Sequence, residues 1–216
     1  MLHYLPGCDV RNNHPLAIEK LTNYMLNQGA KIDVCCRVTE KFLNDGDVIV
    51  QNCTLCELLV KESHPDNECL SIYEYVLRDS TFPFKDHTGE VITVQDCVRN
   101  KDKRHLQDAV RACLRRMNYT IVEMDSAYEK TRYCGMWIFG RPMQNCFDVA
   151  PKAMNYLVDH YVEILSEEEK IRRMQEWVKQ FGSEQVLVYC NGCEKGMKAG
   201  GITPIHLVEL LAEGLS

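Results

Sequence analysis

The chain has 216 residues, of which 45% are hydrophobic and 26% are charged, and its formal net charge is −6. This length suits one domain or two small ones, and the composition is ordinary for a globular protein. An acidic chain without a basic stripe argues against nucleic-acid binding, which depends on neutralising phosphates. No apolar run reaches the roughly 18 residues of a membrane helix, and the N-terminus lacks a secretory pattern. We therefore expect a cytoplasmic protein without a membrane span.

The spacing of apolar residues alternates between strand and helix periods along the chain. The predicted elements, in chain order, are a strand over 2–5, a helix from 15 to 29, strands over 31–34, 48–50 and 91–94, a helix over 105–117, a strand over 120–124, helices over 152–165 and 167–181, a strand over 186–189 and a helix over 206–213. Strands that alternate with helices predict an α/β fold with mainly parallel strands.

The chain also repeats its own pattern. A strand, a cysteine and a helix occur near the start, at Tyr4–Cys8, and again at Val94–Cys97. Each copy later contains a strand followed by a CxxC pair, Cys53-Thr-Leu-Cys56 in one and Cys190-Asn-Gly-Cys193 in the other. We predict two pseudo-symmetric, Rossmann-like βαβ units over residues 1–82 and 88–216, with a helical insertion over 143–182 in the second.

Cysteine is the unusual feature of the composition, with twelve in the chain. Disulfide frameworks belong mainly to short exported proteins, so in a reducing compartment three interpretations remain. The thiols bind metal, carry out redox chemistry, or are buried and inert.

Nine of the cysteines form two ordered sets, most of them directly after a predicted strand. The first set is Cys8, Cys35, Cys36, Cys53 and Cys56, and the second is Cys97, Cys134, Cys190 and Cys193. The carboxyl ends of parallel strands form the edge where open α/β sheets bind ligands. Thiolates at that edge select zinc or iron–sulfur clusters. Five thiols exceed the four that tetrahedral zinc takes, whereas four suit zinc or a cluster.

The other cysteines are interpreted differently. Cys113 falls on the apolar face of a predicted helix and is expected in the core. Cys69 and Cys146 are expected to be buried thiols, with a substitute ligand as the alternative for either. Cys146 is an alternative ligand for the second set, where Tyr133 stands in the place of a paired cysteine.

The doubled C…CC…CxxC arrangement resembles the cysteine-rich CCG domain over nearly the whole chain. That domain occurs in the B subunit of heterodisulfide reductase, in glycolate oxidase iron–sulfur subunits and in lactate-utilisation iron–sulfur proteins. The resemblance implies a [4Fe–4S] cluster, of cubane or non-cubane type, on the five cysteines of the first set. For the second set it implies zinc or an iron–sulfur cluster.

The resemblance also implies a function. The chain would be an iron–sulfur redox protein or an oxidoreductase subunit that transfers electrons to a disulfide or a small organic acceptor. The sequence has no CxxCxxCxxxCP run, so other redox subunits, of ferredoxin type or flavoproteins, would deliver the electrons. The alternative is a zinc-stabilised scaffold or assembly protein without turnover. No catalytic residue is assigned.

Overall fold

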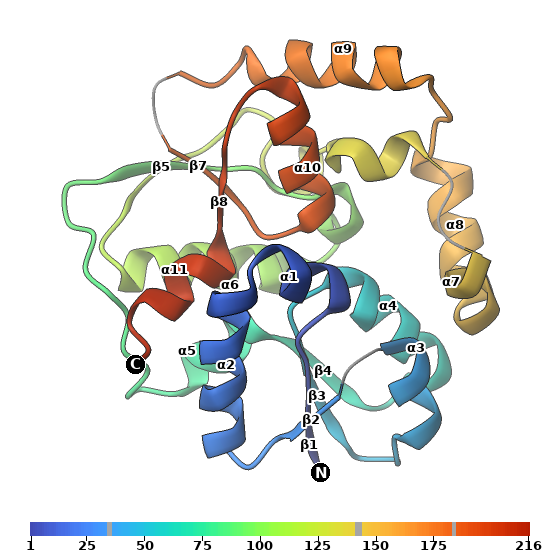
Figure 1. Ribbon diagram of the computed structural model, residues 1–216, viewed down its shortest axis with the longest axis vertical. Helices are drawn as coiled ribbons and strands as arrows, with labels where there is room; N and C mark the ends of the chain where they lie inside the picture. Colours follow the sequence, from blue (N-terminus) through green and yellow to red (C-terminus); the bar gives the residue numbers. More distant parts are fainter. Residues whose placement is uncertain (34–35, 141–143, 183–184) are drawn as a thin grey trace. The chain divides into compact units, whose positions relative to one another are not determined.

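The computed structural model describes residues 1–33, 36–140, 144–182 and 185–216, and over these residues the chain forms two compact α/β units (Figure 1). The first unit comprises residues 1–83, 142–156 and 208–216, and the second comprises 84–141 and 157–207. Within the described residues, each unit holds one four-stranded sheet in which every pairing is parallel. The predicted fold class is therefore confirmed.

The first unit has the strand order β2-β1-β3-β4. Its elements are β1 (Leu2–Leu5), α1 (Cys8–Asn13), α2 (Pro15–Asn27), β2 (Lys31–Ile32), α3 (Cys36–Thr39), the 3₁₀ helix η1 (Glu40–Phe42), β3 (Val48–Gln51), α4 (Thr54–Ser63), β4 (Glu68–Ser71), α5 (Ile72–Arg78) and α7 (Gln144–Val149). In Figure 1, α2 and α5 lie on one side of these strands, and α3 and α4 lie on the other.

The second unit has the strand order β6-β5-β7-β8. Its elements are β5 (Val91–Val94), η2 (Val98–Asn100), α6 (Arg104–Arg116), β6 (Thr120–Val122), η3 (Tyr128–Lys130), η4 (Gly135–Phe139), α9 (Glu167–Val178), β7 (Gln185–Val188), α10 (Asn191–Gly200) and β8 (Ile205–His206). Two further helices, α8 (Pro151–Tyr161) and α11 (Leu207–Glu213), have residues in both units.

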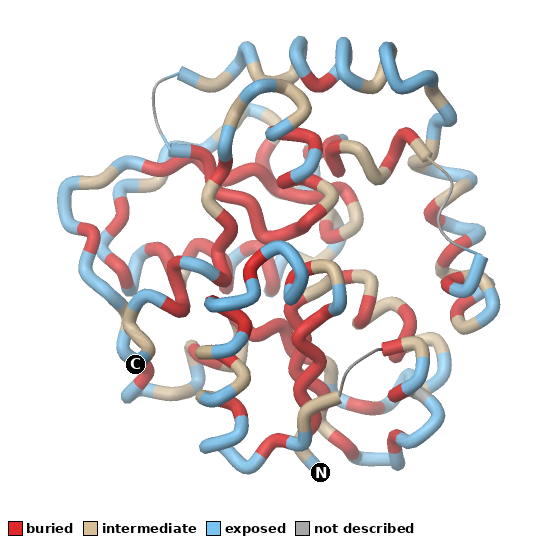
Figure 2. The backbone as a smooth tube through the Cα atoms, in the orientation of Figure 1, coloured by how far each residue is buried: buried red, intermediate tan, exposed pale blue. Residues whose placement is uncertain are grey.

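The two sheets are built on one plan, because the first strand of each unit lies between the second and the third. The central strands are continuous apolar runs, as expected where helices cover both faces of a parallel sheet. Ile49 and Val50 of β3 are fully buried, as are Leu187 and Val188 of β7. Figure 2 shows these strands as the buried centre of each unit.

The division of the chain differs from the predicted units, 1–82 and 88–216. Residues 142–156 and 208–216 fall within the predicted second unit in sequence, yet they group with the first unit. The described part of the predicted insertion contains the helices α7, α8 and α9, but α7 belongs to the first unit and α9 to the second. A repeat is recognised from the order of residues along the chain, whereas a compact unit is defined by packing. The repeat pattern therefore does not predict that the chain returns to the first unit.

Candidate metal centre

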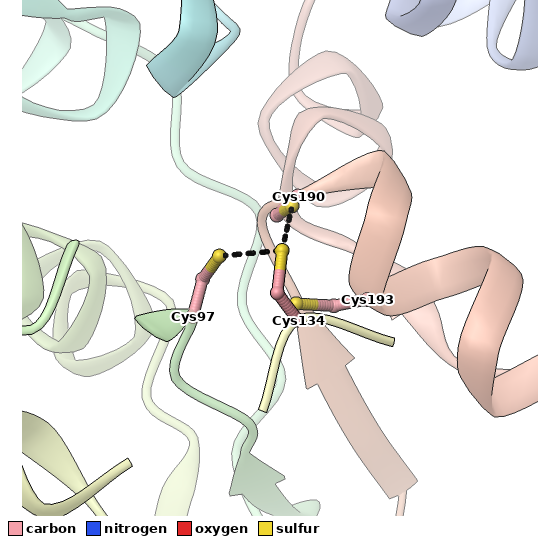
Figure 3. Close-up of side chains that lie close together, drawn as sticks. All are labelled: Cys97, Cys134, Cys190 and Cys193. Atoms are coloured by element: carbon pink, nitrogen blue, oxygen red, sulfur yellow. Dashed lines mark hydrogen bonds between the residues drawn. The ribbon is translucent and has the colours of Figure 1, made fainter. Parts of the chain in front are cut away.

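Four cysteines of the second unit meet at the carboxyl ends of its strands (Figure 3). Cys97 caps η2 after β5, Cys134 caps η4, Cys190 caps α10 after β7, and Cys193 lies in the first turn of α10. Their sulfur atoms all lie within 4.8 Å of one another, with 3.2 Å between Cys97 and Cys134 and 3.9 Å between Cys134 and Cys190. All four are buried. The second predicted set is thus a closed group of sulfur donors that could hold a metal ion or cluster.

The four thiols differ in how readily they ionise. Hydrogen bonds from the other three thiols, aided by the Arg99 guanidinium, lower the pKa of Cys190 well below its ordinary value. Burial instead raises the pKa of Cys134 and that of Cys193. Arg99 donates from Nη2 to Cys190 Sγ at 2.8 Å, and its guanidinium lies 4.7 Å from the ring centroid of Trp137. Cys190 therefore carries negative charge first, with a positive partner already in place.

Tyr133 stands directly before Cys134, in the place of a paired cysteine. Its ring is buried and stacks on Trp177 with 4.9 Å between centroids, and its hydroxyl donates to the Cys193 carbonyl at 3.3 Å. Trp177 is held in turn by a bond of 2.8 Å from Nε1 to Gln95 Oε1. Burial raises the pKa of Tyr133, so the phenol stays neutral. Tyr133 thus packs and hydrogen-bonds beside the four cysteines, and its neutral phenol carries no negative charge that could bind a metal.

Glycines on one face of α10 allow Cys134 to approach the CxxC pair. Gly192 and Gly196 lie four residues apart, so they share one face of the helix. A Cβ on Gly196 would clash with the Cα of Gly135, and a Cβ on Gly135 would clash with the carbonyl oxygen of Gly192. Gly135 also has a φ of 52°, in the left-handed region. The segment that carries Cys134 can therefore lie against α10 only because these residues have no side chains.

A buried ionic network supports the backbone at Cys97. The Arg111 guanidinium binds both carboxylate oxygens of Asp96, at 2.8 and 3.1 Å, and also binds Glu123 at 2.6 and 2.7 Å. The Tyr189 hydroxyl donates to Asp96 at 2.8 Å and accepts from the Cys97 amide at 3.4 Å. Arg111 and Asp96 have no exposed side-chain surface. This network fixes the backbone at Cys97. No sequence motif predicted the network.

The first predicted set lies only partly within the described residues, because Cys35 falls outside them. Cys8 begins α1 and is exposed, whereas Cys36 begins α3 and is buried. Cys53 caps α4 and is half-buried, and Cys56 is buried in the first turn of that helix. The CxxC pairs of the two units thus have the same position, at the start of a helix that follows the third strand.

Three of these thiols interact directly. A hydrogen bond with Cys56 lowers the pKa of Cys36, and the bonds of Cys56 with Cys36 and Cys53 raise the pKa of Cys56 well above its ordinary value. Gly7, with a φ of 75°, carries the chain into Cys8, and a Cβ on Gly7 would lie 3.2 Å from the Cβ of Cys53. The turn that leads to Cys8 therefore lies against the CxxC pair.

Cys146 is a buried thiol, as predicted. The alternative prediction, a substitute ligand beside Tyr133, would require it to lie in the second unit. The structure instead places it in the first unit, on α7, where it interacts with Arg37, Cys36 and Cys8. Because the repeat pattern does not show that the chain returns to the first unit, the sequence offered no signal for this position.

Comparisons with known proteins leave the family open. No family model, curated protein or solved structure matches the chain. Across the described parts of the chain, every helix is too short or too polar to span a membrane.

Proposed function

We propose that this chain is a redox protein or oxidoreductase subunit that carries an iron–sulfur cluster in its first unit and a single metal ion in its second. One observation supports this above all: in each unit, cysteines gather where the parallel strands end, the edge where open α/β sheets bind ligands. The cluster ligands would be Cys8, Cys35, Cys36, Cys53 and Cys56. The ligands of the ion would be Cys97, Cys134, Cys190 and Cys193.

The dimensions of the second site favour one ion. A metal–sulfur bond of about 2.3 Å places the sulfur atoms of a regular tetrahedron about 3.8 Å apart. The sulfur pairs at 3.2 and 3.9 Å, with all pairs within 4.8 Å, agree with that spacing. A cluster inserts several iron and sulfide atoms between its thiolates and spreads them further. The four buried thiols also match a closed structural zinc site, which has no open coordination position.

The first site has a different character. Its five cysteines exceed the donors of one tetrahedral ion, and the neighbouring side chains at 35 and 36 diverge, which a polynuclear cluster tolerates. Cys8 is exposed and Cys53 half-buried, so this side of the site is accessible from solvent within its unit. Accessibility suits electron exchange with a partner or an acceptor.

The resemblance to CCG-domain proteins supports the choice of redox chemistry. The acceptor would be a disulfide or a small organic molecule. Reduction of a disulfide to two thiols consumes two electrons and two protons. Because the sequence has no ferredoxin cluster motif, a ferredoxin-type or flavoprotein subunit would supply those electrons.

Metal and acid-labile sulfide analysis of the anaerobically purified chain tests this proposal. We expect about four iron and four sulfide per chain, with a visible absorption that dithionite bleaches, and about one further metal ion. Cys36→Ser should remove the iron and sulfide but leave the further ion, whereas Cys193→Ser should do the reverse. A wild-type protein that holds neither iron nor sulfide would sink the redox proposal.

A second candidate is a zinc-stabilised scaffold without turnover. The observation that favours it is the closed, fully buried geometry of the second site, which is that of a structural metal. Stoichiometric zinc and a colourless anaerobic preparation would establish this candidate in place of the first.

A further inference from the structure

The side chain of Arg99 connects three of the segments that carry the cysteines of the second unit. Arg99 lies in η2, which Cys97 caps, and its Nη2 donates to Cys190 Sγ at 2.8 Å. Its guanidinium also lies 4.7 Å from the ring centroid of Trp137, a residue of η4, which Cys134 caps. One side chain thus binds the Cys190 sulfur directly and joins it to the segments that present Cys97 and Cys134.

The backbone holds Arg99 in this position. On one side of it, the Val98 amide donates to the Tyr133 carbonyl at 2.8 Å, and on the other, the Asn100 amide donates to the Cys97 carbonyl at 2.8 Å. Arginine has a planar head group that is already organised for hydrogen bonding, so it loses less freedom for each bond formed than a more flexible side chain does. The guanidinium is therefore held ready beside the sulfur atom.

Trp137 keeps the guanidinium against the CxxC pair. Its amide donates to the Cys134 carbonyl at 3.2 Å, and a Cβ on Gly192 would lie 3.0 Å from the Trp137 Cβ. Because Gly192 stands between Cys190 and Cys193 in the chain, the Trp137 side chain begins beside the CxxC turn. A guanidinium is attracted to the face of an aromatic ring, so Trp137 helps to fix Arg99 at this place.

A cation here meets an electrostatic need of the four buried cysteines. Thiols must lose their protons to bind a metal, so a divalent ion on four thiolates leaves two negative charges in excess. Buried charge is costly unless it is paired. The Arg111 guanidinium, which is also buried in this unit, is already paired with Asp96 and Glu123. Arg99 is placed to offset half of the excess through a charge-assisted hydrogen bond to sulfur.

We propose that Arg99 is a positioning residue of the second-unit metal centre, which orients the Cys190 thiolate and balances its charge when an ion is bound. This inference rests on the proposed function, because it requires a metal ion on the four cysteines. A hydrogen bond from the guanidinium stabilises the electron pairs of the Cys190 sulfur. Arg99 would therefore make the ion harder to remove and the bound thiolate less nucleophilic.

Variants of the full chain test this assignment. Arg99→Met keeps an unbranched side chain that can pack on Trp137 but removes the charge and the donors, whereas Arg99→Lys keeps the charge without the planar guanidinium. Arg104→Met is the matched control. Arg104 is an exposed arginine of the same unit, its guanidinium lies 3.8 Å from the ring centroid of Tyr128, and it binds Asp108.

Three measurements would compare each variant with the wild type. Competition with a chromophoric chelator gives the zinc affinity. The visible spectrum of the cobalt-substituted protein gives the energy of the thiolate-to-cobalt charge-transfer band, which depends on the hydrogen bonds that the sulfur atoms accept. Circular dichroism verifies that the chain is folded.

Arg99→Met should lower the zinc affinity by about 10–100-fold, as the loss of a group that supports a metal ligand does. It should also move the charge-transfer band to longer wavelength, because sulfur electrons are easier to remove without the hydrogen bond. Arg99→Lys should lie between Arg99→Met and the wild type in both measurements, and Arg104→Met should match the wild type.

Wild-type affinity and spectrum in a folded Arg99→Met would overturn the inference and leave the proposed function standing. So would a reduced affinity with an unshifted band, since a role in packing alone produces that result. If Arg99→Met does not fold, an unshifted band in Arg99→Lys overturns the inference by itself. A wild-type chain that binds neither zinc nor cobalt at the four cysteines would overturn the inference together with the second-unit ion of the proposed function.

Discussion

The substitution Gly196→Ala tests whether the close packing of α10 builds the second-unit metal centre. The added methyl would lie 2.5 Å from the Tyr133 hydroxyl and 2.8 Å from the Met174 sulfur, and it would clash with the Cα of Gly135. Alanine is favoured over glycine in a helix by about 1 kcal/mol, so the change would be stabilising where there is room. Overpacking costs about 1–3 kcal/mol, and contact with backbone puts this site at the upper end. We expect a net loss of about 2 kcal/mol in the free energy of unfolding.

The same clash should weaken metal binding. Gly196 lies one turn after Cys193, so displacement of α10 moves the CxxC sulfurs away from Cys134. We expect the metal affinity to fall by about 10–100-fold, as it does when a residue that supports a metal ligand is lost. Urea unfolding and competition with a chromophoric chelator measure the two effects. Gly140→Ala is the matched control, because its Cβ would meet only Lys170 Nζ, at 3.9 Å. Wild-type stability and affinity in Gly196→Ala would refute the reasoning.

Three further outcomes follow from the second unit. Cys134→Ser should abolish its metal binding, whereas Cys113→Ser, which changes a buried thiol on α6, should not; equal metal content in the two variants would contradict the site. Asp96→Asn removes one of the two carboxylates that bind the buried Arg111, while Glu123 remains, so urea unfolding should show a loss of about 1.5–3 kcal/mol, and a loss below about 0.5 kcal/mol would count against the network. The lowered pKa of Cys190 means that its thiolate contributes stability above its unfolded pKa, which is lost as pH falls through the folded value. Near neutral pH, zinc binding to the folded metal-free chain should therefore release fewer than four protons, and calorimetry in buffers of different ionisation enthalpy would disprove this by finding four.

Much of the architecture could be predicted because the central strands are mostly apolar. The strand at Leu2–Leu5 has the predicted bounds, and Cys97 follows β5 as expected. The edge strands β4 and β8 could not be predicted, since Glu68–Ser71 and Ile205–His206 mix polar with apolar residues. Their partners in the sheet, distant in sequence, decide their conformation.

The positions of the candidate site residues, like the fold, could be predicted only where local spacing determines them. Local spacing placed the CxxC pairs after strands, which the structure shows for Cys53 after β3 and Cys190 after β7. The helices α4 and α10, which begin at these pairs, were not predicted. Local spacing could not place Cys134, which follows β6 only after a loop and η3. Nor could it place Cys146 or the buried Arg111, because their partners are set by packing between segments that are far apart in the chain.

The segment between Cys134 and Cys190 makes the two pseudo-symmetric units chemically different. Its helix α9 contributes Trp177, which stacks on Tyr133 beside the second set. Its helix α7 belongs to the first unit and contributes a sulfur atom there, at Cys146. One insertion thus places an aromatic ring beside one cysteine set and a buried thiol in the other unit. Under the proposed function, two copies of one sheet topology would hold a closed structural ion in one unit and an accessible redox centre in the other.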